Sequence, residues 1–158
     1  MGFICSIIIV EDIARSRKLY EEVLQMKVTS DFGVLYNIGF EGGLSMYRKG
    51  FFEELIQGKV KLAKNNNVSL YFEVDDLDGL EKEIAAQGLE FVHGVREQPW
   101  KQRTFRFYDF DNHVLEVAEK MDVVLHRLKR NGHSLEEIAG FTGYTVAQVQ
   151  AGLEKQPG

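Results

Sequence analysis

The sequence predicts an α+β fold in which one strand–helix–three-strand unit, βαβββ, occurs twice and is followed by a helical extension. The first observation is internal repetition, because residues 68–118 reproduce residues 4–48 imperfectly. The second is a shared junction: an apolar run gives way to a helical pattern at IVEDI (9–13) and again at EVDDL (73–77). The third is that strand-like patterning ends near residue 118. A duplicated unit of this kind is able to enclose a cavity, which is where we expect function to lie.

The first module is predicted over residues 1–48. Residues 3–10 are apolar and β-branched, which indicates a strand buried on both faces. Asp12 is placed to cap a helix that continues to about Gln25. Three strands follow, and Gly42 and Gly43 form the tight turn between the last two. These strands are expected near 28–32, 34–40 and 43–48.

A linker over residues 49–67 leads to the second module, residues 68–118. A helical turn is expected within the linker at 51–56, and the run Asn65–Asn67 is a structure breaker. A strand at 68–74 then precedes a helix that Asp76 caps and that ends near Gly88. Three strands complete this module, near 90–95, 102–109 and 113–118.

The helical tail, residues 119–158, is a separate predicted region. A helix over 120–130 ends at Asn131–Gly132. Ser134 with Glu137, and Thr145 with Gln148, have the spacing of capping boxes, which predicts two more short helices. The pattern resembles the helix-turn-helix tails of small regulators. The alternative is a helical cap that buries Leu135, Ile138, Phe141 and Val149 on the rest of the chain or on a partner.

Composition excludes several classes of function. Of the 158 residues, 44% are hydrophobic and 27% charged, as is usual for a soluble globular protein. The formal charge of −5 argues against a general nucleic-acid or anionic-membrane binder. One cysteine, Cys5, permits no internal disulfide, which fits the cytoplasm. The first apolar run stops at Glu11, too short for a membrane span or a signal segment.

The chain resembles the vicinal-oxygen-chelate superfamily, which contains glyoxalase I, bleomycin-resistance proteins, fosfomycin-resistance enzymes and extradiol dioxygenases. Three stretches over residues 1–118 carry the resemblance, in order and at the right spacing: 10–24, 72–77 and 98–116. The resemblance implies paired βαβββ modules that form a U-shaped mixed sheet around a pocket, often in a homodimer. It also implies a divalent metal in the catalytic members, held by His, Gln or Glu from the first and last strands of each module.

Carried over residue by residue, the four metal positions are degenerate. Cys5 and Ser69 each lie seven residues before the helix caps, and Gly39–Tyr47 aligns with Asp109–Val117, which relates Met46 to Glu116. Only Glu116 is a suitable ligand for Mg, Mn, Zn or Fe(II), because Cys and Met favour soft ions and Ser is a poor ligand. We therefore expect no metal and no other cofactor.

Arg106 is expected to pair with Glu116. If Asn112 takes the left-handed position of the turn between the last two strands, residue 109 pairs with 113, and paired numbers sum to 222. Arg106 then lies directly across from Glu116, on the face that the resemblance makes the pocket face. Two interpretations stay open: Arg106 also binds an anionic or carbonyl group of a ligand, or the pair is purely structural.

Other candidate ligand-binding residues follow from the same register. Thr104 and Tyr108 share the face of Arg106, Tyr36 aligns with Arg106 in the first module, and Trp100 lies in a loop longer than its counterpart. If the chain is an enzyme, Glu116 is the candidate catalytic residue.

Three functions remain open on the sequence. The first is a metal-independent small-molecule binding protein of the glyoxalase/bleomycin-resistance type. The second is a lactoylglutathione-lyase-like or other metal-dependent enzyme of the superfamily. The third is a ligand-responsive DNA-binding regulator that uses the tail. The tail contains five basic and five acidic residues, a balance that is unfavourable for binding DNA.

Overall fold

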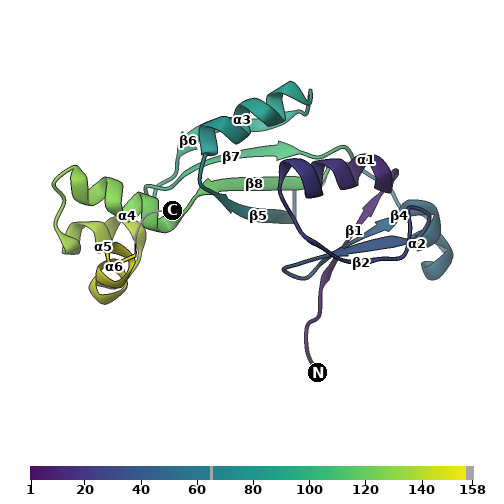
Figure 1. Cartoon of the computed structure of the whole chain (residues 1–158), viewed down its shortest axis with the longest axis horizontal. Coiled ribbons are helices and arrows are strands. Elements are labelled where there is room, and N and C mark those ends of the chain that lie inside the picture. The colour runs from purple at the N-terminus through teal and green to yellow at the C-terminus, as the bar shows by residue number, and fades with distance from the viewer. Residues whose placement is uncertain (65, 156–158) are drawn as a thin grey trace. The chain divides into compact units, whose positions relative to one another are not determined.

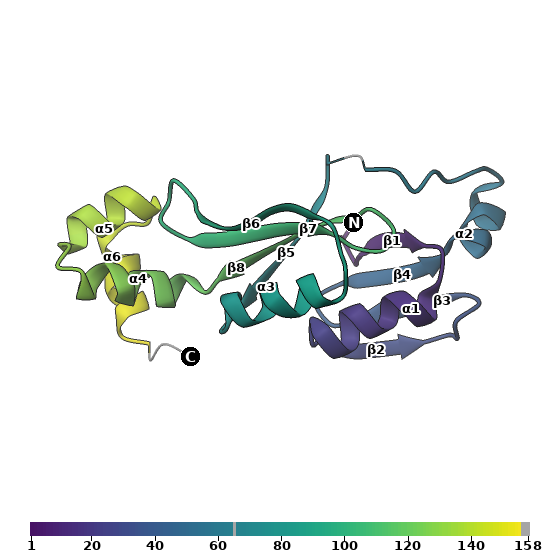
Figure 2. The same cartoon turned by 90° about the horizontal axis from the view of Figure 1, so that it is seen from above.

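The computed structural model describes residues 1–64 and 66–155, and residue 65 of the predicted breaker lies outside them. The chain forms two compact units (Figures 1 and 2). Unit 1 comprises Met1–Ser69 with Tyr108–Val114, and unit 2 comprises Leu70–Phe107 with the chain from Leu115 onwards. The predicted α+β class is confirmed by two four-stranded sheets with helices. The predicted division at residue 118 stays a prediction.

Unit 1 contains the first βαβββ module. Its sheet has the order β1-β4-β3-β2, in which β1 and β4 are parallel and the other pairs antiparallel. The β-strands are β1 (Ser6–Val10), β2 (Val28–Asp31), β3 (Asn37–Phe40) and β4 (Leu44–Arg48). The helices are α1 (Ile13–Arg17), the π-helical segment η1 (Lys18–Val23) and α2 (Lys49–Ile56).

The local signals of unit 1 act as predicted at the helix start and at the tight turn. The Asp12 carboxylate accepts a hydrogen bond from the Arg15 amide and caps α1. Gly42 and Gly43 both have positive φ, and a Cβ on Gly43 would lie 3.2 Å from the Ile4 carbonyl oxygen. The prediction that the first strand is buried on both faces is wrong, because Ile7 in β1 is 46% exposed.

Unit 2 contains most of the second module. Its sheet has the order β5-β8-β7-β6, and β6 and β7 are antiparallel. Its strands are β5 (Ser69–Val74), β6 (Phe91–Glu97), β7 (Arg103–Tyr108) and β8 (Val114–Glu119), and its helix is α3 (Leu77–Ala86). As predicted, the Asp76 carboxylate accepts a hydrogen bond from the Gly79 amide and caps α3. The core of this unit contains the fully buried rings of Phe105 and Phe107, which contact each other.

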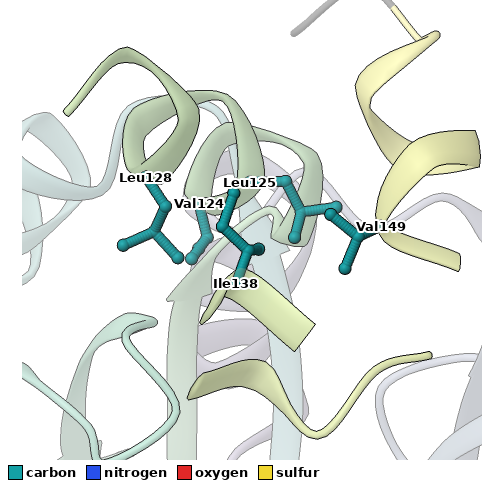
Figure 3. Close-up of a cluster of buried hydrophobic side chains, with 5 residues drawn as sticks. All are labelled: Val124, Leu125, Leu128, Ile138 and Val149. Atoms are coloured by element: carbon teal, nitrogen blue, oxygen red, sulfur yellow. The ribbon is translucent and has the colours of Figure 1, made fainter. Parts of the chain in front are cut away.

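The C-terminal helices share a core of their own. They are α4 (Met121–Arg130), α5 (Leu135–Thr142) and α6 (Val146–Leu153). Both predicted capping boxes are present. Figure 3 shows that α4, α5 and α6 all contribute to one cluster of buried side chains: Val124, Leu125, Leu128, Ile138 and Val149.

Two glycines of the tail give a paired stability prediction. A Cβ on Gly152 would overlap the Cδ1 of Leu125, which is 1% exposed, whereas a Cβ on Gly140 meets nothing within 4 Å. Gly152→Ala is therefore expected to lower the free energy of unfolding by about 1–2 kcal/mol through overpacking. Gly140→Ala lies inside α5 and is expected to raise it by about 0.5–1 kcal/mol, because alanine favours the helix. Urea unfolding followed by circular dichroism compares the two, and equal effects would contradict the close α4–α6 packing.

Candidate functional site

The candidate site lies on the face of the second sheet that points away from Phe105 and Phe107. We call it the open face and define it by Tyr71 on β5, His93 on β6, Arg106 on β7 and Glu116 on β8. Alternation along β7 and β8 places Arg106 and Glu116 there, because Phe105, Phe107, Leu115 and Val117 occupy the other face and are fully buried. All four residues that define the open face belong to unit 2.

Arg106 and Glu116 form the ion pair expected from the register. The hairpin turn has the predicted form: Asn112 has a φ of 69°, and the Asp109 amide donates to the His113 carbonyl oxygen. Nε and Nη2 of Arg106 lie 2.8 and 2.7 Å from the same Glu116 oxygen, Oε2. The two side chains are 22% and 14% exposed, so the pair is largely shielded from water. A charge-balanced pair is stable in such surroundings, whereas a single charge would not be.

His93 completes the arrangement, and the sequence did not single it out. Its Nδ1 lies 2.8 Å from the Gly94 carbonyl oxygen, and its Nε2 lies 2.8 Å from Arg106 Nη1. A carbonyl oxygen only accepts and a guanidinium only donates, so Nδ1 carries the proton and Nε2 accepts. His93 in this form and Glu116 together hold the guanidinium in one orientation.

Tyr71 and Gln102 border the ion pair with a chain of hydrogen bonds. Gln102 Nε2 donates to the Tyr71 hydroxyl, which donates to Glu73. Burial is the main cause that raises the pKa of Tyr71 to about 12; the Gln102 hydrogen bond lowers this pKa, and the hydrogen bond to Glu73 contributes to raising it. Tyr71 is therefore a neutral hydroxyl at physiological pH rather than a base.

Two of the other predicted ligand residues, Thr104 and Tyr108, are buried, and two, Tyr36 and Trp100, are exposed. Thr104 is fully buried, and its hydroxyl accepts a hydrogen bond from Gln98 Nε2 at 2.7 Å. Tyr108 is 8% exposed and its hydroxyl donates to Asn66 Oδ1 in unit 1. Tyr36 in unit 1 is 50% exposed, and its ring packs edge-on against Phe51 of α2. Trp100 in unit 2 is 37% exposed, and its indole N–H donates to Gln102 Oε1.

The predicted equivalence of Met46 and Glu116 is wrong by one residue. Residues 37 and 47 are paired in the first hairpin, so paired numbers sum to 84 and its centre is Gly42. The second hairpin is centred on Asp111, which makes Tyr47 the counterpart of Glu116 and Asn37 the counterpart of Arg106. Met46 instead shares the fully buried face of the first sheet with Ile38.

The corrected set of positions does not fit a divalent metal. Cys5 accepts a weak hydrogen bond from the Ser45 hydroxyl at 3.7 Å, and the Tyr47 ring stacks on Phe51. Ser69 is an exposed hydroxyl, and the Glu116 carboxylate is bound to Arg106. Across residues 1–64 and 66–155, no three His, Cys, Asp or Glu side chains are grouped so that they could hold an ion. The donor chemistry therefore does not suit Mg, Mn, Zn or Fe(II).

Comparison with known proteins identifies the fold of the chain that carries this site. The model of the glyoxalase-like domain family matches residues 3–122. A protein of unknown function from Agrobacterium tumefaciens str. C58 is 36% identical, with a TM-score of 0.66 over 76% of this chain and 94% of that chain. The fosfomycin resistance protein FosX from Mesorhizobium loti is 22% identical, with a TM-score of 0.56 over 75% of this chain and 92% of that chain.

A more distant structural relative has an enzymatic name. Lactoylglutathione lyase from Agrobacterium tumefaciens is 14% identical, with a TM-score of 0.53 over 75% of this chain and 92% of that chain. At this identity the likeness shows the fold alone. No curated protein gives a significant match. Among the described residues, none of the helices has the length and apolar character of a membrane span.

Proposed function

Because the chain belongs to the glyoxalase-like domain family, we propose that it binds a small organic molecule at the open face of the second sheet without the help of a metal ion. The observation that carries the proposal is the contact of Arg106 with Glu116 and His93. Arg106 supplies next to Glu116 the positive charge that a metal ion would supply in the catalytic members of the superfamily.

The geometry of Arg106 supports a ligand that bears a carboxylate or a carbonyl group. Its guanidinium has five N–H groups, and its contacts to Glu116 and His93 use one on each nitrogen. One N–H on Nη1 and one on Nη2 are left for a ligand, in the plane that suits bidentate binding of a carboxylate. Both contacts to Glu116 use Oε2, so Oε1 is left to accept from a ligand hydroxyl or amine.

Aromatic and hydroxyl groups around the pair favour a ligand with an apolar body. Tyr71 is 52% exposed and Trp100 is 37% exposed, and the side chains of both form hydrogen bonds with Gln102. Aromatic side chains with a polar end suit a small molecule that is partly apolar and partly hydrogen-bonded. Thr104 and Tyr108 stay candidate ligand-binding residues, although their hydroxyls are bound to Gln98 and Asn66 in this structure.

The enzymatic alternative assigns a different role to Glu116. In a lactoylglutathione-lyase-like or other metal-dependent enzyme, this carboxylate would be a metal ligand or a catalytic base. It would then have to leave Arg106 when the metal or substrate binds. The ion pair and the unsuitable donors elsewhere favour binding over this chemistry.

A DNA-binding regulator is the weaker alternative. The segment α6, which would be the recognition helix of a helix-turn-helix, has the sequence VAQVQAGL and no basic residue. Affinity for DNA depends on phosphate contacts from Lys and Arg, which this helix does not supply.

Two further features of the proposal are a homodimer and a cytoplasmic location. The homodimer is supported by apolar side chains that are exposed in unit 1, among them Phe3 at 83% and Ile4 at 84%. A cytoplasmic location is supported by the single cysteine.

Metal content tests the proposal directly. The full chain, purified without chelators, is expected to contain far less than stoichiometric zinc, nickel, manganese or iron by elemental analysis. Added Zn²⁺ or Ni²⁺ is expected to leave its melting temperature unchanged, because a bound ion would stabilise the native state by mass action. The variant Glu116→Gln serves as control, since it removes the one carboxylate among the four positions considered for a metal. A stoichiometric ion that is lost in Glu116→Gln would overturn the proposal in favour of a metalloenzyme.

A further inference from the structure

We infer that the C-terminal helices hold the β6–β7 loop in place and thereby position Trp100 at the rim of the open face, with Arg127 of α4 as the positioning residue. The β6–β7 loop comprises residues 98–102, between the end of β6 and the start of β7. Figure 2 shows this loop beside α4 and α5. Every residue in the proposed connection lies in unit 2.

One guanidinium connects α4 to three parts of the sheet. Arg127 Nη2 donates to the Lys101 carbonyl oxygen at 2.7 Å and to Glu119 Oε1 at the end of β8. Its Nη1 lies 3.3 Å from Glu97 Oε2 at the end of β6. The Arg127 side chain is 26% exposed and the Glu119 side chain 6%, so water competes weakly for these contacts. Arg127 therefore links the helical tail to the β6–β7 loop, to the end of β6 and to the end of β8.

Gln102 carries the connection from Glu119 to the aromatic rings. It is 3% exposed, and its Nε2 donates to the Glu119 carbonyl oxygen and to the Tyr71 hydroxyl, each at 2.8 Å. Its Oε1 accepts the Trp100 indole N–H at 2.8 Å. The indole is thus fixed by a side chain that is itself held by Glu119, the partner of Arg127.

Lys101 provides a second link between the loop and the tail. Its ammonium lies 5.4 Å from the centre of the Phe141 ring of α5 and 3.0 Å from Glu97 Oε1. Its φ of 70° is a left-handed conformation that a non-glycine residue adopts at an energetic cost. Two contacts to the tail, from the Lys101 ammonium to Phe141 and from the Lys101 carbonyl oxygen to Arg127, offset that cost.

The tail residues that contact the β6–β7 loop lie outside the family domain. The family model matches residues 3–122, so Arg127 and Phe141 lie outside the matched region. The tail is therefore an addition that acts on the rim of the open face. The inference rests on the proposed function only in treating this rim as part of a ligand site. Its test needs no ligand, so it fails or succeeds separately from the proposed function.

Trp100 is the single tryptophan of the chain, so its fluorescence reports on the loop alone. In the full chain, Arg127→Met is expected to raise the acrylamide quenching constant of Trp100 at least about twofold and to shift its emission to the red, because the loop opens locally. Arg130→Met is the control: it removes an arginine from the last turn of the same helix, at an exposed position, and is expected to change neither quantity. Quenching in a folded Arg127→Met protein that equals the wild-type value would overturn the inference.

A milder variant decides the case if Arg127→Met does not fold. Glu119→Gln keeps the side-chain volume, and its amide oxygen is able to accept the hydrogen bond that the Arg103 backbone amide donates to Glu119 Oε1. The substitution removes the negative charge that Arg127 binds. Quenching of Trp100 is expected to rise in this variant as well, by less than in Arg127→Met. An unchanged quenching constant and emission maximum in Glu119→Gln would equally reject Arg127 as a positioning residue.

Discussion

Replacing Asp109 by alanine is expected to lower the free energy of unfolding by about 3–4 kcal/mol. The Asp109 carboxylate is 5% exposed and accepts four hydrogen bonds. Its Oδ2 accepts from the Tyr20 hydroxyl and from His113 Nδ1, each at 2.8 Å. Its Oδ1 accepts from the backbone amides of Asp111 and His113, each at 2.9 Å. Alanine leaves all four donors without their acceptor, and Tyr20 is fully buried.

Urea unfolding followed by circular dichroism measures the effect, with two comparison variants. Glu41→Ala removes an exposed carboxylate from the β3–β4 turn of the same unit and is expected to change stability by less than about 0.5 kcal/mol. Asp109→Asn keeps the shape and one carbonyl oxygen, so a smaller loss of about 1–2 kcal/mol is expected. If Asp109→Ala were as stable as Glu41→Ala, the turn would not be held by this carboxylate.

Acid titration adds a second signature of the same group. Burial tends to raise the pKa of Asp109, but the hydrogen bond and charge of His113 together with the Tyr20 hydrogen bond outweigh it, and the pKa is lowered. The native state then binds fewer protons than the unfolded one, so this contribution is present above about pH 4 and is lost as the pH falls through the lower native pKa. Asp109→Asn is expected to flatten that acid loss of stability.

The pKa of Asp111, two residues further along the chain, is shifted in the opposite direction. Burial raises its pKa, so its ionisation reduces stability as the pH rises from about 4 through the higher native value. The two carboxylates therefore change stability in opposite directions in neighbouring pH ranges, Asp109 below about pH 4 and Asp111 above it.

Short-range signals in the sequence were sufficient to predict most of the fold. Asp12, Asp76, Ser134 and Thr145 cap helices where their spacing indicated, because a cap depends on residues two or three positions away. The ion pair of Arg106 with Glu116 was predictable for the same reason. Its register depends on a single turn in which Asn112 tolerates positive φ.

The errors arose where a long-range or one-residue difference decides the outcome. Alignment by sequence similarity made Met46 the counterpart of Glu116 in the first module, and a slip of one residue exchanges the two faces of a strand. His93 reaches Arg106 because the β6–β7 pairing shifts register on both sides of His93, which simple alternation does not reveal. The hydroxyls of Thr104 and Tyr108 form hydrogen bonds with Gln98 and Asn66. These partners lie in a loop and in the linker, whose paths the alternation of side chains along a strand does not predict.

Removing Arg106 is expected to destabilise the protein more than removing both members of its ion pair. Arg106→Met leaves the Glu116 carboxylate, 14% exposed, without its cation, which is expected to cost about 2–3 kcal/mol. The double variant Arg106→Met with Glu116→Met leaves neither charge of this pair behind, and stability is expected to return to within about 1 kcal/mol of wild type. Arg96→Met, at an exposed position of β6, is the arginine control and should have little effect.

The same variants separate a structural pair from a ligand site. If Arg106 only neutralises Glu116, the double variant retains ligand binding along with stability. If Arg106 binds the ligand, the double variant is stable but no longer gains melting temperature from carboxylate-bearing compounds that stabilise the wild type. The single variant Glu116→Met completes the set. If the effects of Arg106→Met and Glu116→Met on the free energy of unfolding simply added in the double variant, this would contradict the pairing itself, because residues in direct contact are expected to show an interaction energy. The two outcomes are measured on one set of proteins, so stability and binding at Arg106 are resolved independently.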